Sequence, residues 1–298
     1  MFKNILIIGF GMIGSSIAQT AIKNNKSLNI YAFDKSSTLK KRLKKYKLSK
    51  IIALNSLSEA NKKNIDLIII CTPVLQYLSI FKKIDKFING KFIVTDVGST
   101  KSNIENLYKK NNFKFKFIPA HPIAGIEKSG LENGFVGLFD NRYNIICPIK
   151  KTPKSEVNRV IKFWKSLSMK IEIMSSKEHD SVLSLTSHLP HIISYSLVLT
   201  AMKKEKSFNS KLIKFSAGGF RDFTRVAGSD PQMWRDIFLA NNNQIQKLTN
   251  TFIIELKKFS KELNSKNSKK LLKKLELTKK VRNRIVKARQ AGKFIPND

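Results

Sequence analysis

Cysteine, arginine and acidic residues are scarce in this chain of 298 residues, and it has no long hydrophobic run. The two cysteines, Cys71 and Cys147, are too few for a disulfide framework, and both stand in apolar strand-like runs. We therefore expect buried thiols in a reducing compartment, the cytoplasm. Because no run of about 18 apolar residues occurs, no transmembrane helix is expected.

Acidic residues number 21 against 56 lysines and arginines, which leaves a formal charge of +35 at pH 7. Such a charge by itself favours a nucleic-acid or membrane-surface partner. Arginines, however, account for only 9 of the 56, and the 47 lysines are spread through most segments. A nucleic-acid surface would instead gather arginines and aromatic side chains on one face. We interpret the charge as a solvated lysine surface and expect neither a nucleic-acid nor a membrane partner.

The first half of the chain alternates strand-like and helix-like segments. Asp66–Cys71 is an almost continuous apolar run, which is typical of a central parallel strand covered on both faces. Further strands are expected at Lys3–Ile8, Asn29–Phe33, Lys91–Asp96, Phe115–Pro119, Tyr143–Pro148 and Lys170–Met174, and helices at Gly11–Asn24, Leu39–Leu48, Val74–Ile88, Ser102–Asn111 and Lys154–Leu167. This alternation predicts an N-terminal Rossmann domain of the α/β class with a doubly wound parallel sheet.

The expected strands end near residue 174, and the rest of the sequence is typical of helices. The expected helices are Ser176–Ser187, Pro190–Lys203, Ser207–Gly218, Pro231–Phe259 and Ser268–Ala291, with a solvated loop at Lys257–Lys270. An apolar stripe consists of Leu248, Phe252, Leu256 and Phe259. The change predicts two domains, residues 1–174 and an all-helical domain, 175–298, with the apolar stripe along one helix face.

A glycine-rich turn joins the first expected strand to the first expected helix. Gly9 permits the tight turn, Gly11 lets the backbone approach a pyrophosphate, and Gly14 lets the helix pack close to the strand. Asp34 ends the second strand, where a carboxylate binds the ribose hydroxyls and repels a 2′-phosphate. These residues predict a dinucleotide cofactor, NAD rather than NADP. Its contacts are expected from Gly9, Gly11, Met12, Ile13, Gly14, Asp34, Thr72 and Pro73.

Four further motifs follow along the chain. They are TDVGSTK at residues 95–101, HPIAGIEKSG at 121–130, SHLPH at 187–191 and GGFRDFTRVAGSDPQMWRDI at 218–237. In this order, together with the glycine-rich turn, they resemble the prephenate/arogenate dehydrogenase family. The resemblance implies an oxidative decarboxylation: a hydride leaves ring C4 of a cyclohexadienol, the 4-hydroxyl proton departs and CO2 is lost from C1. Since the ring becomes aromatic, the enzyme chiefly orients the reactants and accepts one proton.

The resemblance also implies roles for individual residues. His121 is the expected catalytic base, and Ser99 is expected to contact the same substrate hydroxyl beside the nicotinamide. Arg225 is expected to hold a substrate carboxylate, for which a two-pronged guanidinium is suited. The further residues expected at the substrate are His191, His188 and Glu127, with Asp180 and Trp234 in support. His179 is expected to face solvent, the role of Arg221 stays open, and no metal site is predicted. The resemblance, together with the apolar stripe, also implies a homodimer through the helical domain.

Several alternatives stay open beside a prephenate dehydrogenase of tyrosine biosynthesis. Arogenate carries an alanyl side chain where prephenate carries a pyruvyl one, so an arogenate or dual-specificity enzyme would differ mainly around one charged amine. A site rich in histidine and arginine favours the keto acid prephenate slightly. A β-hydroxyacid dehydrogenase would use a lysine base and has no counterpart of HPIAG and SHLPH. A basic nucleic-acid-binding protein with a vestigial nucleotide domain is the most remote alternative.

Overall fold

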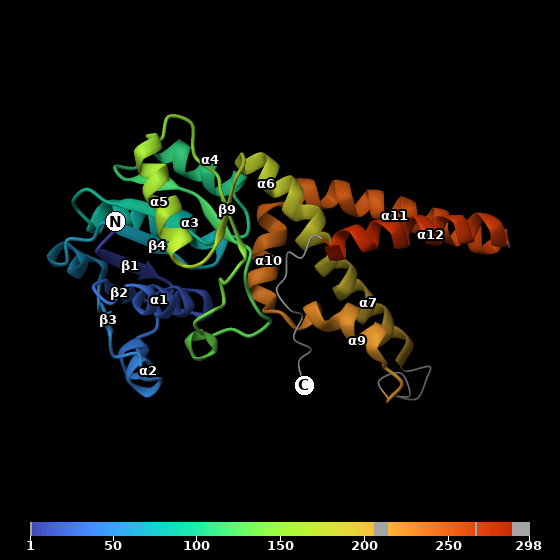
Figure 1. Ribbon diagram of the computed structural model, residues 1–298, viewed down its shortest axis with the longest axis horizontal. Helices are drawn as coiled ribbons and strands as arrows, with labels where there is room; N and C mark the ends of the chain where they lie inside the picture. The colour runs from blue at the N-terminus through green and yellow to red at the C-terminus, as the bar shows by residue number, and fades with distance from the viewer. Residues whose placement is uncertain (1, 206–213, 266, 288–298) are drawn as a thin grey trace.

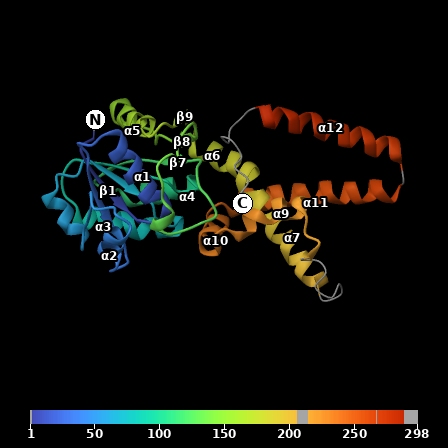
Figure 2. The ribbon, with the colours of Figure 1, turned by 60° about the horizontal axis from the view of Figure 1, so that its bottom comes forward.

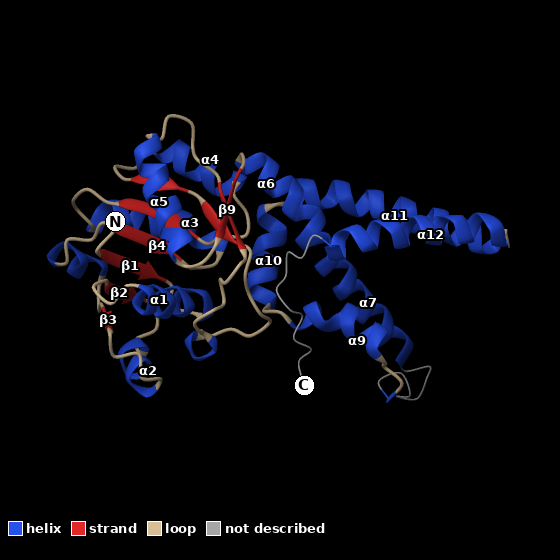
Figure 3. Ribbon diagram, in the orientation of Figure 1, coloured by secondary structure: helices blue, strands red, loops and turns tan. Residues whose placement is uncertain are grey.

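The computed structural model describes residues 2–205, 214–265 and 267–287, which form two parts of different architecture. The strands gather in the N-terminal part, whereas helices make up the C-terminal part (Figure 3). Two long helices, α11 (Asn242–Asn264) and α12 (Ser268–Lys287), project from the body as an arm (Figure 1). The expected fold class, an α/β domain followed by a helical one, is confirmed.

Six parallel strands form the main sheet in the order β3-β2-β1-β4-β5-β6. They are β1 (Asn4–Ile8), β2 (Asn29–Phe33), β3 (Ile51–Ala53), β4 (Leu67–Ile70), β5 (Ile93–Asp96) and β6 (Lys116–Ile118). Alternate side chains point to opposite faces, so Ile7 of β1 joins the core on one face and Ile8 the core on the other. The order reverses between β1 and β4, and ligands of such sheets bind beside this point, at the carboxyl ends of the strands.

Helices cover both faces of this sheet, because both faces are apolar. They are α1 (Met12–Asn24), α2 (Leu39–Lys45), α3 (Tyr77–Phe87), α4 (Ser102–Asn111) and α5 (Lys154–Ser166), with short 3-10 turns η1 (Leu57–Lys62), η2 (Val74–Gln76) and η3 (Leu131–Asn133). Trp164 of α5 fills the core on one face and Phe81 of α3 the core on the other, and both are fully buried. The sheet is therefore doubly wound, as expected.

A second, smaller sheet differs from the expectation. Strands β7 (Ala120–Pro122), β8 (Tyr143–Ile146) and β9 (Lys170–Ile173) lie in this order, with β7 antiparallel to β8 and β8 parallel to β9. Placing the last two in the parallel sheet was wrong, because an apolar run indicates a strand without specifying its neighbour. His121, two residues after the end of the expected strand Phe115–Pro119, consequently lies within a strand and is paired with Ile145.

The helical part begins with one long run where two helices were expected. Its elements are α6 (Ser176–Leu183), the π-helical turn η4 (Ser184–His188), α7 (Leu189–Glu205), α9 (Gly218–Thr224), the 3-10 turn η6 (Arg225–Gly228) and α10 (Pro231–Ala240), followed by α11 and α12. The expected helix Pro231–Phe259 is interrupted at Asn241, and α11 extends to Asn264 through much of the expected loop Lys257–Lys270. Most of the expected helix Ser207–Gly218 lies outside the described residues.

The continuous run Ser176–Glu205 is long and apolar enough, by length and composition alone, to cross a membrane, and it is the one such helix in the described part of the chain. The core helix of a protein without membrane segments passes the same test. Here the run carries His179, Asp180 and His188, which are almost fully buried against neighbouring elements. We assign the run to the functional site described next, and the absence of a membrane span stays a prediction.

Candidate active site

The glycine-rich turn between β1 and α1 has the shape that a pyrophosphate requires. Gly9 has a φ of +88°, and a Cβ there would stand 2.8 Å from the backbone of Cys71. A Cβ on Gly14 would come within 2.6 Å of the Gly9 carbonyl oxygen. A Cβ on Gly11 would meet nothing within 4 Å, so this backbone faces open space at the N-terminus of α1. Two of the glycines thus permit close packing and the third leaves room for a ligand.

The carboxylate of Asp34 joins the end of β2 to this turn. It accepts hydrogen bonds from the backbone N–H of Phe10 at 2.8 Å and of Ser36 at 2.9 Å. The neighbouring strand β4 ends at Cys71-Thr72-Pro73, and the Thr72 hydroxyl is buried without a hydrogen-bond partner among the described residues. An acidic group, an unpaired hydroxyl and an open glycine at one sheet edge fit a dinucleotide.

A buried carboxylate, Asp96, holds together the two segments that carry the expected catalytic residues. Its Oδ2 accepts hydrogen bonds from Gly98 N and from the Tyr77 hydroxyl, both at 2.9 Å, and from the buried ammonium of Lys101. Its Oδ1 accepts one from Ala120 N at 2.9 Å. The loop after β5 and strand β7 are therefore fixed to each other. Burial raises the pKa of Tyr77, and the nearby Asp96 charge raises it further.

His121 projects from β7 into a chain of hydrogen bonds with the helical part. Its Nδ1 lies 2.8 Å from Nε2 of His179, and Nδ1 of His179 lies 2.8 Å from Oδ1 of Asp180. Asp180 also accepts from the backbone N–H groups of Lys101 and Ser102, each at 2.8 Å, and so caps α4 from α6. The expectation that His179 faces solvent is wrong, since its exposed fraction is 0%. Asp180, the next residue along the helix, lies in the same chain of hydrogen bonds. Its supporting role stays a prediction.

The surroundings of this chain of hydrogen bonds keep its two histidines, His121 and His179, neutral. Burial lowers the pKa of His121 well below its ordinary value, and His179, Lys101 and His188 lower it further. Burial also lowers the pKa of His179, against the opposing effect of Asp180. Burial raises the pKa of Asp180, but the His179 hydrogen bond and the two backbone donors prevail and leave it below its ordinary value. An ionised acceptor therefore faces a neutral histidine, which faces a neutral His121.

A third histidine, His188, contacts an asparagine at the break between α10 and α11. Asn241 donates from Nδ2 to the Asp180 carbonyl oxygen at 2.9 Å and lies 3.2 Å from Nδ1 of His188. Burial lowers the pKa of His188 to about 4, and the nearby backbone of Ser99 opposes this shift. The ring of His188 meets that of Trp234 edge to face, 6.1 Å between centroids. We call His121, His179, Asp180, His188 and Asn241 the polar cluster.

Beside the polar cluster lies the expected carboxylate-binding group. Arg225 forms an ion pair with Glu127, which belongs to the loop between β7 and β8. The ring of His191 stacks on Trp234, 3.4 Å between centroids and 22° between planes, and its Nδ1 lies 2.8 Å from the carbonyl oxygen of Ser187. Burial lowers the pKa of His191, while Glu127 raises it and Arg225 lowers it. The fold thus brings three distant motifs to one place.

Two further residues of the motifs, Ser99 and Arg221, are not buried. Ser99 is partly exposed and is not the N-cap of α4, which starts after Lys101. Arg221 is exposed on α9. Among the described residues, no group of three or more His, Cys, Asp and Glu side chains is placed to hold a metal ion.

Sequence reasoning missed Asp96, Lys101 and Asn241 although all three lie in or beside the quoted motifs. A signal existed for the first two, because an acid and a lysine flank a glycine turn at the end of an apolar strand. Asn241 opens an asparagine triplet that interrupts the apolar periodicity of the expected helix. Its partners in the polar cluster could not be identified from that interruption.

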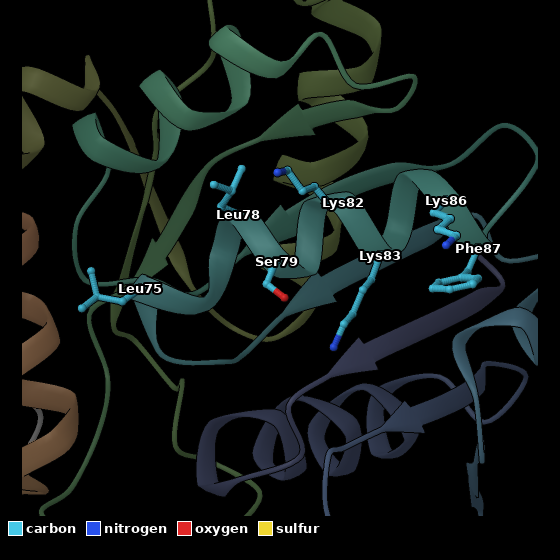
Figure 4. Close-up of a pocket in the computed structure, with 7 residues that line it drawn as sticks. All are labelled: Leu75, Leu78, Ser79, Lys82, Lys83, Lys86 and Phe87. Carbon is cyan, nitrogen blue, oxygen red and sulfur yellow. The ribbon is translucent and has the colours of Figure 1, made fainter.

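An open pocket on the outer face of α3 lies apart from these groups. Figure 4 shows its lining side chains, which are Leu75, Leu78, Ser79, Lys82, Lys83, Lys86 and Phe87. None of the expected site residues lines it, and it offers lysines and apolar side chains without an acid–base pair. This pocket therefore contains none of the groups that the expected chemistry requires.

Comparisons with known proteins agree with this geometry. Two family models match, "Prephenate dehydrogenase, nucleotide-binding domain" over residues 17–173 and "Prephenate dehydrogenase, dimerization domain" over 175–277. A cyclohexadienyl dehydrogenase of Zymomonas mobilis is 32% identical over 282 residues, which are 95% of this chain and 96% of that relative. A prephenate dehydrogenase of Bacillus subtilis is 34% identical over 286 residues, covering 95% and 76% of the two chains.

A solved structure gives the same result. Prephenate dehydrogenase of Aquifex aeolicus, in complex with hydroxyphenyl propionate and NAD+, has a TM-score of 0.88 and 32% identity, and the match covers 96% of this chain and 99% of that one. The expected resemblance and the NAD-dependent oxidoreductase class are thereby confirmed, and a β-hydroxyacid dehydrogenase is set aside. The chain belongs to the prephenate dehydrogenase family.

Proposed function

We propose that this protein converts prephenate to 4-hydroxyphenylpyruvate and CO2 with NAD as oxidant, a step of tyrosine biosynthesis. The observation that carries the proposal is the neutral, buried His121 in a fold that also brings Arg225 close to His191. A neutral imidazole accepts a proton near neutral pH, and a guanidinium binds a carboxylate. The names of the relatives support the same reaction.

NAD would lie along the edge where β1, β2 and β4 end. Gly9, Gly11 and Gly14 would admit its pyrophosphate to the N-terminus of α1, and Asp34 would bind the ribose. Further contacts are proposed for Met12, Ile13, Thr72 and Pro73. When bound, NAD takes up the hydride that leaves ring C4 of the substrate.

His121 Nε2 is the proposed acceptor of the 4-hydroxyl proton, with the Ser99 hydroxyl contacting the same oxygen. As C4 is oxidised, the C1 carboxylate leaves as CO2, and its bonding electrons enter the ring. The oxygen on C4 is then a phenolate, which takes the proton back from His121. Prephenate and NAD+ thus yield 4-hydroxyphenylpyruvate, CO2 and NADH. The residues need only position the hydroxyl and hold one proton for this interval.

Arg225 would bind a substrate carboxylate in place of its present partner Glu127. This exchange gives Glu127 influence over access to the pocket, because the two anions compete for one guanidinium. His191, held flat on Trp234, and the buried His188 would line the same space. Burial favours neutral forms of both histidines, which suits contact with a keto acid.

Arogenate, or both substrates, is the second candidate, and the cyclohexadienyl dehydrogenase among the relatives favours it. The test is a steady-state comparison of prephenate and arogenate, each with NAD and with NADP. We expect the highest kcat/KM for prephenate with NAD. A preference for arogenate would make arogenate the substrate in place of prephenate. If the protein turned over neither compound, the proposed function would be wrong.

We also propose a cytoplasmic homodimer formed by a helical domain, residues 175–298, that follows a nucleotide-binding domain, residues 1–174. The apolar side chains of the arm support it: Leu256, Leu263, Leu272, Leu277 and Ile285 have exposed fractions of 56–63%. Such a surface is typical of an interface. Light scattering of the purified protein should give twice the chain mass of 34.0 kDa.

A further inference from the structure

Hydrogen-bond directions along the polar cluster follow from its anionic end. Asp180 is ionised, so it can only accept, and Nδ1 of His179 must carry the hydrogen between them. A neutral His179 then has a bare Nε2, which can only accept. Nδ1 of His121, 2.8 Å away, must therefore be the donor. This leaves Nε2 of His121 without hydrogen.

We propose that His179 and Asp180 are positioning residues that act through His121, fixing the tautomer in which Nε2 of His121 is the bare nitrogen that receives the substrate proton. This inference rests on the proposed function, in which His121 is the proton acceptor. Without His179, a neutral His121 is free to carry its hydrogen on either nitrogen. The wrong choice would present an N–H to the substrate hydroxyl and no base.

The groups around His121 are consistent with this assignment. Lys101 is paired with Asp96, and both are fully buried, so the two charges largely offset each other. His188 also lies near His121 and is neutral near neutral pH. Asp180 is thus the anion that acts on the imidazole chain through His179. After proton uptake, His121 still donates from Nδ1 to His179, and no proton passes to Asp180.

The hydrogen bonds of Asp180 to α4 explain why the arrangement is rigid. Its two oxygens accept from Lys101 N and Ser102 N, which start the helix after the catalytic loop. The carboxylate therefore keeps its orientation without help from His179. It presents a fixed acceptor to which the two histidine rings align in turn.

The first test reads the tautomers directly and needs no turnover. The chain has four histidines, so ring-15N labelling gives a simple NMR spectrum. At neutral pH we expect His121 to carry its hydrogen on Nδ1. Its signals are identified as those that disappear in His121→Asn. His188, whose Nδ1 faces the Asn241 amide, should carry hydrogen on Nε2 and serves as the internal contrast. Hydrogen on Nε2 of His121 would overturn the proposal, whatever the substrate.

The second test compares two variants that differ by one methylene. In His179→Asn the amide takes the place of Nδ1, which keeps the contact with Asp180 and removes the acceptor for His121. In His179→Gln the amide oxygen reaches the place of Nε2 and can accept from His121. We expect His179→Asn to lower kcat roughly 10–100-fold at nearly unchanged KM for both substrates, and His179→Gln to recover most of it.

Equal losses in the two variants, or a loss confined to thermal stability, would show that His179 only fills space. A third variant, Asp180→Ala, removes the acceptor of the His179 Nδ1 hydrogen, so the hydrogen of His121 should no longer be confined to Nδ1 in the NMR spectrum. An unchanged spectrum in that variant would remove Asp180 from the proposal. If the wild-type protein turns over neither prephenate nor arogenate, the proposed function fails while the NMR results still decide the tautomer.

Discussion

The two parts of the molecule treat their apolar side chains in opposite ways. In the α/β part, every residue of β4 is buried, and helices close both faces of the sheet. In the arm, α11 has one buried residue, Ile245, and α12 has none (Figure 2 shows how far they project). The first part completes its core alone, whereas the second leaves apolar side chains exposed, as the proposed dimer interface requires.

The proposed proton acceptor and the proposed carboxylate-binding group lie on opposite sides of the same division. His121, the proposed proton acceptor, belongs to a strand of the α/β part, while Arg225 and His191 belong to the helical part. The acceptor is 9% exposed, but the Arg225 side chain is 45% exposed. We therefore expect changes at His121 and in the α/β core to act on kcat and stability, and changes at Arg225 or in the arm to act on substrate binding and assembly.

The largest effect is expected from His121→Asn, which removes the proton acceptor. We predict a fall of kcat by about 10²–10⁴-fold, the usual contribution of a positioned base. The affinity for NAD should stay as in the wild type, because the dinucleotide contacts lie at the ends of β1, β2 and β4. Steady-state kinetics and NAD titration measure the two. Near-wild-type turnover would take His121 out of the mechanism.

A matched pair of truncations tests the difference between the two cores. Phe81→Ala removes a fully buried ring that packs against Phe113, Phe117 and Tyr108, and should lower the free energy of unfolding by about 3–5 kcal/mol. Leu272→Ala on α12, 57% exposed, should leave the unfolding of a dilute monomer within about 0.5 kcal/mol. Its effect should appear in the dimer dissociation constant. Equal effects on unfolding in dilute solution would contradict the comparison.

Acid should destabilise the junction of the two parts, because all four histidines have pKa values below 6.5 in the folded chain, with burial as the largest cause. Between those values and 6.5 the unfolded chain binds more protons, so stability is full above pH 6.5 and falls as pH decreases. His188, with a pKa of about 4, alone accounts for about 3 kcal/mol between pH 6.5 and 4.

Denaturant unfolding at a series of pH values measures this loss. His188→Gln serves as the control, since it removes the titrating group and should flatten the dependence on pH. Equal stability at pH 7 and pH 5 in the wild type would mean that the histidines are not buried as described.

The smallest effect is expected on the helical side of the site. Arg225→Ala should raise KM for prephenate by about 10–100-fold, the contribution of a charged hydrogen bond, with a smaller change in kcat. Arg225→Lys should recover only part of the affinity, because an ammonium lacks the two-pronged geometry. An unchanged KM in Arg225→Ala would remove this residue from the substrate site.

The sequence predicted the α/β part more completely than the helical one. Buried parallel strands appear as continuous apolar runs such as Leu67–Ile70, and the glycines of the first turn have a local steric reason. The prediction of one continuous helix over Pro231–Phe259 was wrong at Asn241. The apolar pattern continues across this break, which a tertiary hydrogen bond of Asn241 stabilises. Strands β8 and β9 were found, but their sheet was not, since strand pairing is a long-range property.

For the candidate site, sequence determined the residue types and only the fold decided their partners. Local chemistry marked Asp34 and the glycine turn, because a turn or a strand end depends on neighbours in the chain, whereas the family resemblance of its motif marked His121. His179 stands 58 residues after His121, and no local pattern indicates that its ring would be buried against it. That contact exists because β7 is fixed to the loop after β5, and Asp180 fixes α6 to the helix that follows that loop. Proximity across such a separation is a product of packing, which a linear sequence does not state.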